Sequence, residues 1–258
     1  MRIVVLVKEV PDTFGERKVS LETGLTDREA CDPVLDEICE RAVQAALTLA
    51  GTAGEHSVHL MSMSPESAAS SIRKGLAMGA ESVVHICDPA LLGADLSLTA
   101  EVLAKAIEKE GFDLVIAGNL STDGNGGMVP AMIAEWLDRP HLTHLSALEA
   151  TETTVSGTRA GDDGDSQVTA ELPAVVSITE AFPDARFPNF KGIMAAKKKP
   201  FGTLTLADLG IDAQDFSIPR AIMTEVAERP PRAAGVKVTD DGTAAAQLAD
   251  YLAQNKLI

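Results

Sequence analysis

The residues best suited to chemistry in this sequence lie in one glycine-rich segment, from Gly118 to Val129. The segment follows a short apolar run and precedes a helical pattern, and ligands of α/β proteins bind where strands end in this way. Small residues there let backbone N–H groups approach a phosphate at a helix N-terminus. The candidate binding residues are Gly118, Asn119, Asp123, Gly124, Asn125, Gly126, Gly127, Met128 and Val129.

The same segment is also compatible with a glycine-rich connection that binds no ligand. It lacks the Gly-Lys-Ser/Thr ending of a Walker A loop and the spacing Gly-x-Gly-x-x-Gly. Neither a lysine nor a cluster of magnesium ligands stands within it, so backbone groups would have to bind the phosphate. This pattern favours a nucleotide that is held over one that is hydrolysed.

Asp36 and Cys39 are the next candidates along the chain. Asp36, taken alone, is more typical of a helix N-cap than of a ligand for a ribose or an adenine edge. Cys39 is more typical of a small core residue than of a nucleophile, because no histidine is near it in sequence. The histidines show no metal-ligand spacing, and we expect His141 and His144 in a loop. With no Gly-x-Ser-x-Gly motif, the sequence predicts neither catalytic residues nor a metal site.

A second distinctive segment, 182–199, is a proline-punctuated loop with a basic end. Phe187 and Phe190 flank Pro188, so we expect at least one of the two rings to be exposed. An apolar anchor beside a basic run suits docking to a protein. In isolation, Lys197 to Lys199 are more typical of a solvated helix end. The candidate docking residues are Phe187, Phe190, Ile193, Met194, Lys197 and Lys198.

Short apolar runs alternate with helical periods in the first half of the chain. The predicted strands are 3–7, 58–63, 83–86 and 114–117, and the predicted helices are 35–49, 68–76, 98–107 and 129–137. This alternation predicts an α/β fold with a doubly wound, mainly parallel sheet.

Beyond residue 140 the alternation of strands and helices gives way to a series of β segments. Three β segments, 153–159, 167–172 and 175–179, are predicted there, with an acidic turn at 160–165 between the first two. A final helix is predicted over 243–257. We expect one nucleotide-binding domain over 1–218, which includes the docking loop 182–199, and an extended C-terminal arm over 219–258.

Composition excludes several classes of function. The 258 residues include 22 Lys and Arg against 38 Asp and Glu, a net charge of −16, which argues against nucleic acids and anionic membranes as partners. No apolar run reaches the roughly 18 residues of a membrane-spanning helix. The three cysteines lack Cys-x-x-Cys spacing, and from the short apolar run at residues 3–7 we expect no signal peptide. We therefore expect reduced cysteines and a cytoplasmic protein.

Several motifs carry a resemblance to a known family. They are Leu172-Pro173-Ala174-Val175-Val176, the stretch from Ile193 to Lys199, Ala234-Gly235-Val236-Lys237-Val238, Val7-Lys8 and the stretch from Leu76 to Ala80. In this order, and over essentially the whole length, the chain resembles the β subunit of electron-transfer flavoproteins.

The resemblance implies a Rossmann-like fold and an electron carrier without bond-making catalysis of its own. It implies a 1:1 heterodimer with an α subunit that holds most of a redox-active FAD, while the β subunit buries an AMP without a redox role. It also implies a loop that docks on acyl-CoA dehydrogenases in fatty acid β-oxidation, and a quinone oxidoreductase as acceptor. The C-terminal arm would pack on the α subunit.

The resemblance also implies roles for individual residues. The docking anchor falls on Phe190, and Thr13 or Phe14 would face the flavin. The nucleotide contacts fall on Leu6, Asp36, Cys39, Met63 and the segment from Gly118 to Val129.

Three departures from the family pattern concern the nucleotide. The family commonly has a Gly-x-Gln-Ala-x-Asp opening where this chain has Gly118-Asn119-Leu120-Ser121-Thr122-Asp123. The family commonly has Asn where this chain has Asp36, and a Gln at the start of the helix where this chain has Gly127-Met128-Val129. Backbone contacts to phosphate do not depend on side chains, so we expect AMP. A second FAD in this pocket, as in the electron-bifurcating branch, and a pocket without nucleotide remain the alternatives.

Two other classes of function compete with the carrier. A stand-alone, ATP-binding sensor would need neither the loop 182–199 nor the C-terminal arm. A nucleotide-dependent ligase or hydrolase needs a serine- and glycine-rich loop after the first strand, where this chain has Lys8-Glu9-Val10-Pro11-Asp12. The carrier is therefore the first hypothesis.

Overall fold

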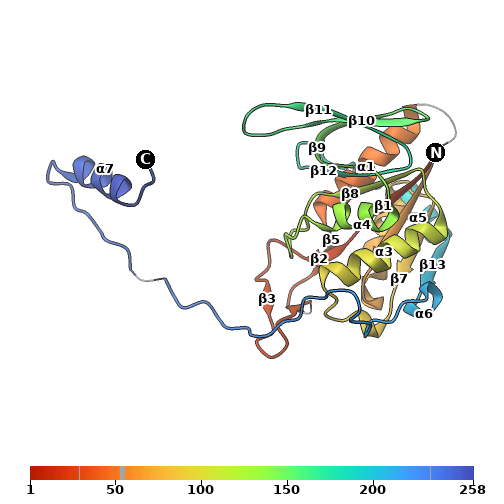
Figure 1. The fold of residues 1–258 in the computed structure, drawn as a ribbon, viewed down its shortest axis with the longest axis horizontal. Coiled ribbons are helices and arrows are strands. Elements are labelled where there is room, and N and C mark those ends of the chain that lie inside the picture. Colours follow the sequence, from red (N-terminus) through yellow and green to blue (C-terminus); the bar gives the residue numbers. More distant parts are fainter. Residues whose placement is uncertain (29, 53–55, 233) are drawn as a thin grey trace. The chain divides into compact units, whose positions relative to one another are not determined.

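The computed structural model describes residues 1–28, 30–52, 56–232 and 234–258 (Figure 1). The chain divides into two compact units, Met1–Glu225 and Val226–Ile258, which are described separately below. Within the described residues, no helix is both long and apolar enough to cross a membrane.

The first unit is built on one large sheet. Among the described residues its strands run in the order β11-β10-β9-β12-β8-β1-β6-β7-β13. Every neighbouring pair from β9 to β13 is parallel, and β10 pairs antiparallel with both β9 and β11. The strands are β1 (Arg2–Leu6), β6 (Ser57–Met63), β7 (Ser82–Ile86), β8 (Leu114–Gly118), β9 (His141–Ala150), β10 (Thr154–Arg159), β11 (Ser166–Glu171), β12 (Ala174–Ile178) and β13 (Phe201–Leu204).

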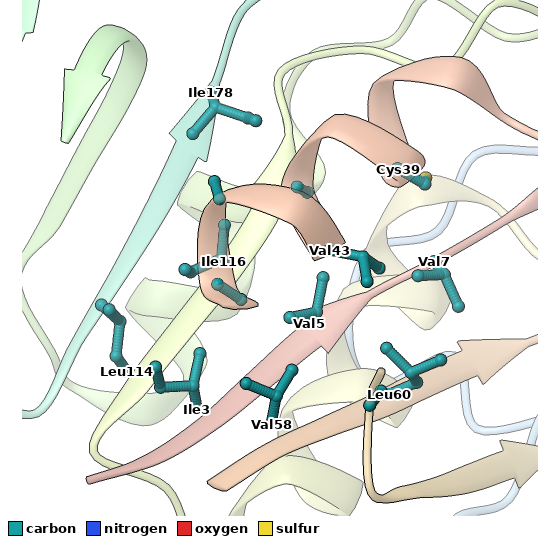
Figure 2. Close-up of a cluster of buried hydrophobic side chains, with 14 of the residues drawn as sticks. Ile3, Val5, Val7, Cys39, Val43, Val58, Leu60, Leu114, Ile116 and Ile178 are labelled. Atoms are coloured by element: carbon teal, nitrogen blue, oxygen red, sulfur yellow. The ribbon is translucent and has the colours of Figure 1, made fainter. Parts of the chain in front are cut away.

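Helices cover both faces of this sheet, as the sequence predicts for a doubly wound fold. Alternate residues of β1 show the two layers: Ile3 and Val5 pack with helices α1 and α2, whereas Val4 packs with α3 and α4. Figure 2 shows side chains of β1, β6, β8 and β12 gathered beneath α1. The helices of these layers are α1 (Glu37–Thr52), α2 (Ala69–Met78), α3 (Leu96–Glu110) and α4 (Val129–Leu137).

The order of the strands places a topological switch point between β1 and β8. From β1 the chain proceeds to β6 and β7, and after α3 it returns to β8 on the other side of β1. Connections therefore leave the carboxyl ends of β1 and β8 in opposite directions, which opens a crevice for ligands in such sheets. The residues after β1 and after β8 meet at this position.

Three expectations about local structure are wrong. The segment 182–199 is not a loop throughout, because its residues Phe190–Ala196 form the helix α5, which Asn189 caps through its side chain. His141 and His144 lie in β9 rather than in a loop. His144 has a φ of 59°, and the pairing of β9 with β12 shifts register beside it, so the alternation of exposed and buried residues that marks a strand is interrupted. Leu35 does not begin a helix, because β5 (Pro33–Leu35) pairs antiparallel with β2 (Glu9–Pro11) and α1 starts after Asp36.

The rest of the first unit consists of short elements. The hairpin of β10 and β11 across the acidic turn 160–165 confirms the sequence prediction. Helix α5 packs on α2, and β3 and β4 form a small hairpin between β2 and β5. These short elements are β3 (Lys18–Val19), β4 (Thr26–Asp27), η1 (Glu66–Ala68), η2 (Pro89–Leu91), α5 (Phe190–Ala196) and α6 (Leu206–Leu209).

The second unit contains one helix, α7 (Ala244–Gln254), within its described residues. Its apolar side chains Leu248 and Tyr251 are both more than half exposed. The position of this helix along the chain confirms the prediction of a terminal helix.

Candidate functional site

Polar residues from three elements meet at the switch point. Lys8 follows β1, and its Nζ lies 2.7 Å from Asp123 Oδ1 and 3.3 Å from Ser121 Oγ in the segment after β8. Asp36, just before α1, accepts a hydrogen bond of 2.9 Å from the backbone N–H of Thr122. The segment that the sequence analysis selected is therefore attached both to the first strand and to the first helix.

Asp123 is held as a carboxylate at this position. Its side chain is only 6% exposed, and burial by itself raises its pKa. The hydrogen bond and the charge of Lys8 outweigh burial, with help from Ser121 and the N–H of Gly124, so the pKa lies below its usual value. Asp123 thus fixes the segment through Lys8 and is already paired before any ligand binds.

Asp36 differs from Asp123 in its electrostatics. Its side chain is fully buried, and burial is the main cause that raises its pKa, with a smaller contribution from the charge of Asp123. The backbone N–H groups of Thr122 and Ile38 offset part of this effect. Asp36 therefore serves both the start of α1 and the segment after β8, so the helix-cap interpretation and the site interpretation describe the same residue.

Three buried polar atoms at the switch point have no hydrogen-bond partner within the described part of the chain. They are Asp36 Oδ1, Asn119 Oδ1 and Thr122 Oγ1. Buried acceptors without partners are rare in folded proteins, and they mark positions where a ligand or a water supplies the donor. A ribose hydroxyl or an adenine amino group is a donor of this kind.

The start of α4 supplies donors on the same segment. Met128 is the N-cap residue and makes no side-chain capping hydrogen bond, so the N–H groups of Val129 and Ala131 receive no cap from it, while Pro130 has no N–H. The turn before it needs positive φ at Asn125 (49°) and Gly127 (65°). The segment thus combines unpartnered acceptors with a helix N-terminus suited to an anion.

The other predicted nucleotide contacts lie at the ends of neighbouring elements. Leu6 ends β1, Met63 ends β6, and Cys39 lies in the first turn of α1. Cys39 is buried in the core, as the sequence predicts for a small core residue, and burial raises the pKa of its thiol to about 12. The contacts of these three residues with a nucleotide stay predictions.

Thr13 and Phe14 lie just beyond β2. Both are exposed, and Phe14 is 96% exposed, with its backbone N–H donating to Asp12 Oδ1. Such a ring is accessible to a second protein, but its role beside a flavin stays a prediction.

The predicted docking residues gather on and just before α5. Phe187 and Phe190 are 90% and 79% exposed, and Ile193 and Met194 are about half exposed. The helix is held close to α2, because a Cβ on Gly192 would lie 2.4 Å from the carbonyl oxygen of Ala77. This exposed apolar group therefore sits on a fixed support.

The basic run after α5 does not act as one unit. Lys197 and Lys198 are exposed, whereas Lys199 Nζ donates to the carbonyl oxygens of Leu76, Gly79 and Ala80 at the end of α2. Burial lowers the pKa of Lys199. The expectation of a solvated helix end is therefore wrong for Lys199, which caps a neighbouring helix instead.

Sequence reasoning missed the ion pair between Lys8 and Asp123 and its second cation, Arg28, whose Nη2 lies 3.9 Å from Asp123 Oδ2. Lys8 directly follows the first apolar run, and this position at the end of a strand was the signal that could have placed it in the site. Its partner is 115 residues away, and only the adjacency of β1 and β8 brings the two together.

Replacing Asp36 with Asn is expected to stabilise the unliganded chain at pH 7. A folded pKa raised above the unfolded value means that ionisation of Asp36 opposes folding. The free-energy cost of ionising Asp36 is absent when the pH lies below the pKa of Asp36 in the unfolded chain. It builds up as the pH rises to the pKa of Asp36 in the folded chain, and above that pH it is constant. Asn keeps an oxygen that can accept from Thr122.

Urea unfolding of both proteins between about pH 4 and pH 8 measures this difference. The advantage of Asp36→Asn should shrink as the pH falls. Asp165→Asn, in the exposed turn between β10 and β11, removes the same charge and should show no such trend. A gap that does not change with pH, or a less stable Asn variant at pH 7, would contradict the role of burial.

Comparison with known proteins identifies the family to which this chain is similar. Residues 25–209 match the model of the electron transfer flavoprotein domain. The chain is 46% identical over 263 residues to the electron transfer flavoprotein subunit beta of Mycobacterium tuberculosis, covering 99% of each chain, and 45% identical to that of Mycobacterium leprae with the same coverage. It is 32% identical to the caffeyl-CoA reductase-Etf complex subunit CarD of Acetobacterium woodii, over 83% of this chain and 82% of that one.

These matches run through the parallel sheet, the switch point and α5, and the mycobacterial relatives extend through the second unit. The resemblance drawn from the motifs is thereby confirmed. The chain belongs to the electron transfer flavoprotein family, among its beta subunits.

Proposed function

We propose that this chain is the β subunit of a heterodimeric electron-transfer flavoprotein. In this role it accepts electrons from acyl-CoA and related dehydrogenases through an FAD held mainly by an α subunit, and passes them toward a quinone oxidoreductase. The observation that carries the proposal is the similarity to beta subunits across 99% of the chain. The FAD supplies the one-electron chemistry, and this chain supplies binding surfaces.

A structural AMP at the switch point is part of the proposal. The unpartnered oxygens of Asp36 and Asn119 suit the donors of a ribose or an adenine, and the start of α4 suits the phosphate. The missing Gln side chain removes one contact but none of these. The residues that would hold the AMP are Leu6, Asp36, Cys39, Met63 and the segment from Gly118 to Val129.

Docking to the electron donor is assigned to α5 and the residues around it. Phe190 is the anchor, with Phe187, Ile193 and Met194 around it, and Lys197 and Lys198 supply positive charge. In a chain with a net charge of −16, this local charge favours a donor with an acidic rim. The exposed position of Phe190 on a fixed helix supports this role.

Replacing both Lys197 and Lys198 with Gln is expected to slow electron transfer from an acyl-CoA dehydrogenase at low salt and to flatten its dependence on ionic strength. Lys199→Gln should leave that dependence unchanged, because its ammonium is committed to carbonyl oxygens of α2. It should instead lower the free energy of unfolding by roughly 1–2 kcal/mol. The measurement is the stopped-flow rate of electron transfer over a series of salt concentrations. If this rate depends on ionic strength equally in wild type and in the double variant, Lys197 and Lys198 do not steer the donor.

The heterodimer itself is tested by expression. The chain produced alone should be colourless, and co-production with its α subunit should give a yellow 1:1 complex that a donor dehydrogenase reduces. A chain that binds flavin and carries electrons as a monomer would contradict the proposal. A colourless homodimer that binds ATP would instead support a sensor protein.

A further inference from the structure

The chain between α6 and the second unit carries the most deeply buried ion pair of the described residues. We name residues 212–225 the strap. Within the strap, Arg220 Nη2 lies 2.5 Å from Glu101 Oε2 on α3, and their side chains are only 5% and 13% exposed. Arg220 Nη1 also lies 3.3 Å from Ser97 Oγ, one turn earlier on the same helix. The cation thus spans the first two turns of α3.

A second contact holds the next residue. The backbone N–H of Ala221 donates to Asp95 Oδ2 at 2.6 Å, while Asp95 Oδ1 accepts from the N–H of Leu98 at 2.8 Å. One carboxylate therefore caps α3 and binds the strap. Met223 then lies against Gly24, where a Cβ would come within 2.7 Å of Met223 Cγ.

The strap makes few apolar contacts: Ala213 packs against the core and Met223 lies against Gly24. Phe216 is 64% exposed and Ile222 is 74% exposed, on either side of the buried Arg220. Desolvating a guanidinium and a carboxylate costs free energy that only good geometry and further hydrogen bonds offset. In a segment with few apolar contacts, the polar contacts of Arg220 and Ala221 are therefore what orders the backbone.

We infer that Arg220 and Glu101 are positioning residues that fix the point from which the chain continues into the second unit, and that this order is needed for the second unit to bind the partner subunit. The inference rests on the proposed function for the identity of that partner. A strap that is already ordered loses less conformational entropy on assembly, and so binding is tighter.

The test uses the full chain with three variants. Arg220→Met removes the cation, and Arg220→Met combined with Glu101→Met removes both charges without leaving a carboxylate unpaired. Lys105→Met is the matched control, because it breaks an exposed ion pair with Glu108 on the same helix. Urea unfolding first checks that each variant folds, and hydrogen exchange of strap amides, that of Ala221 above all, then reports its order.

In Arg220→Met and in the double variant, exchange at Ala221 should be about tenfold faster, and the Kd for the α subunit about tenfold higher; Lys105→Met should match wild type in both. An unchanged rate of hydrogen exchange at Ala221 would show that the ion pair of Arg220 and Glu101, here called the clamp, does not order the strap. Faster exchange with an unchanged Kd would overturn its role in assembly, as would a double variant that recovers wild-type values. If wild type itself binds no α subunit, the proposed function and the assembly role fail together, while exchange still decides whether the clamp exists.

Discussion

Phe190→Asp should reduce the rate of electron transfer from an acyl-CoA dehydrogenase by about tenfold or more at subsaturating concentrations. Truncating or charging an aromatic anchor at the centre of an interface costs roughly 2–4 kcal/mol, and 1.4 kcal/mol corresponds to a factor of ten. Phe190 begins α5 and is 79% exposed, so the unbound protein gains no core packing from its ring. Flavin content and the free energy of unfolding should therefore stay at wild-type values.

The control for this variant is Leu92→Asp. Leu92 is 82% exposed and lies between η2 and α3, so it tests whether any exposed apolar residue has the same effect. Stopped-flow reduction of the complex by the dehydrogenase is the readout. An unchanged rate in Phe190→Asp would remove this residue from the anchor role, and equal losses in both variants would point to the net charge instead.

Gly118→Ala is expected to lower both the stability of the chain and its affinity for the nucleotide. Gly118 ends β8 at the switch point, and a Cβ there would lie 2.7 Å from two γ-carbons of Ile38 on α1. Helix α1 must then move away from β8, which costs about 1–3 kcal/mol. That movement also separates Asp36 from Thr122, so retained AMP should fall about tenfold.

Gly202→Ala is the matched control, because it lies in another strand of the same sheet. The nearest atom to its added Cβ is a backbone oxygen 3.8 Å away. Urea unfolding and the nucleotide released from purified complexes measure the two effects. Full AMP occupancy in Gly118→Ala would show that the close approach of α1 to β8 does not shape the pocket.

The parallel sheet was predictable because its strands are continuous apolar runs, such as Ile3 to Val7. Such runs are typical of strands that helices cover on both faces. The strand β9 was not predictable. A half-buried strand is recognised by alternating exposed and buried residues, and the positive φ at His144 interrupts this alternation. The start of α1 was misplaced because Leu35 continues the helical spacing, although its backbone pairs with Glu9 in the two-stranded antiparallel sheet of β2 and β5.

The candidate site was predictable only as a segment. Small residues after a strand select Gly118 to Val129, but the contacts that shape it join distant residues: Asp36 and Thr122 are 86 apart, and Lys8 and Asp123 are 115 apart. Such pairs follow from the order of the strands, which single-sequence patterns do not fix. For the same reason the lysine run gave no sign that Lys199 reaches the end of α2.

The most direct test is to purify this chain with its α subunit, denature the complex, and identify the released nucleotides by mass. The expected result is one FAD and one AMP per heterodimer. Two FAD would move the protein to the electron-bifurcating branch and make the switch point a redox site. FAD without AMP or any second nucleotide would contradict the assignment of the unpartnered oxygens of Asp36 and Asn119 to a bound nucleotide.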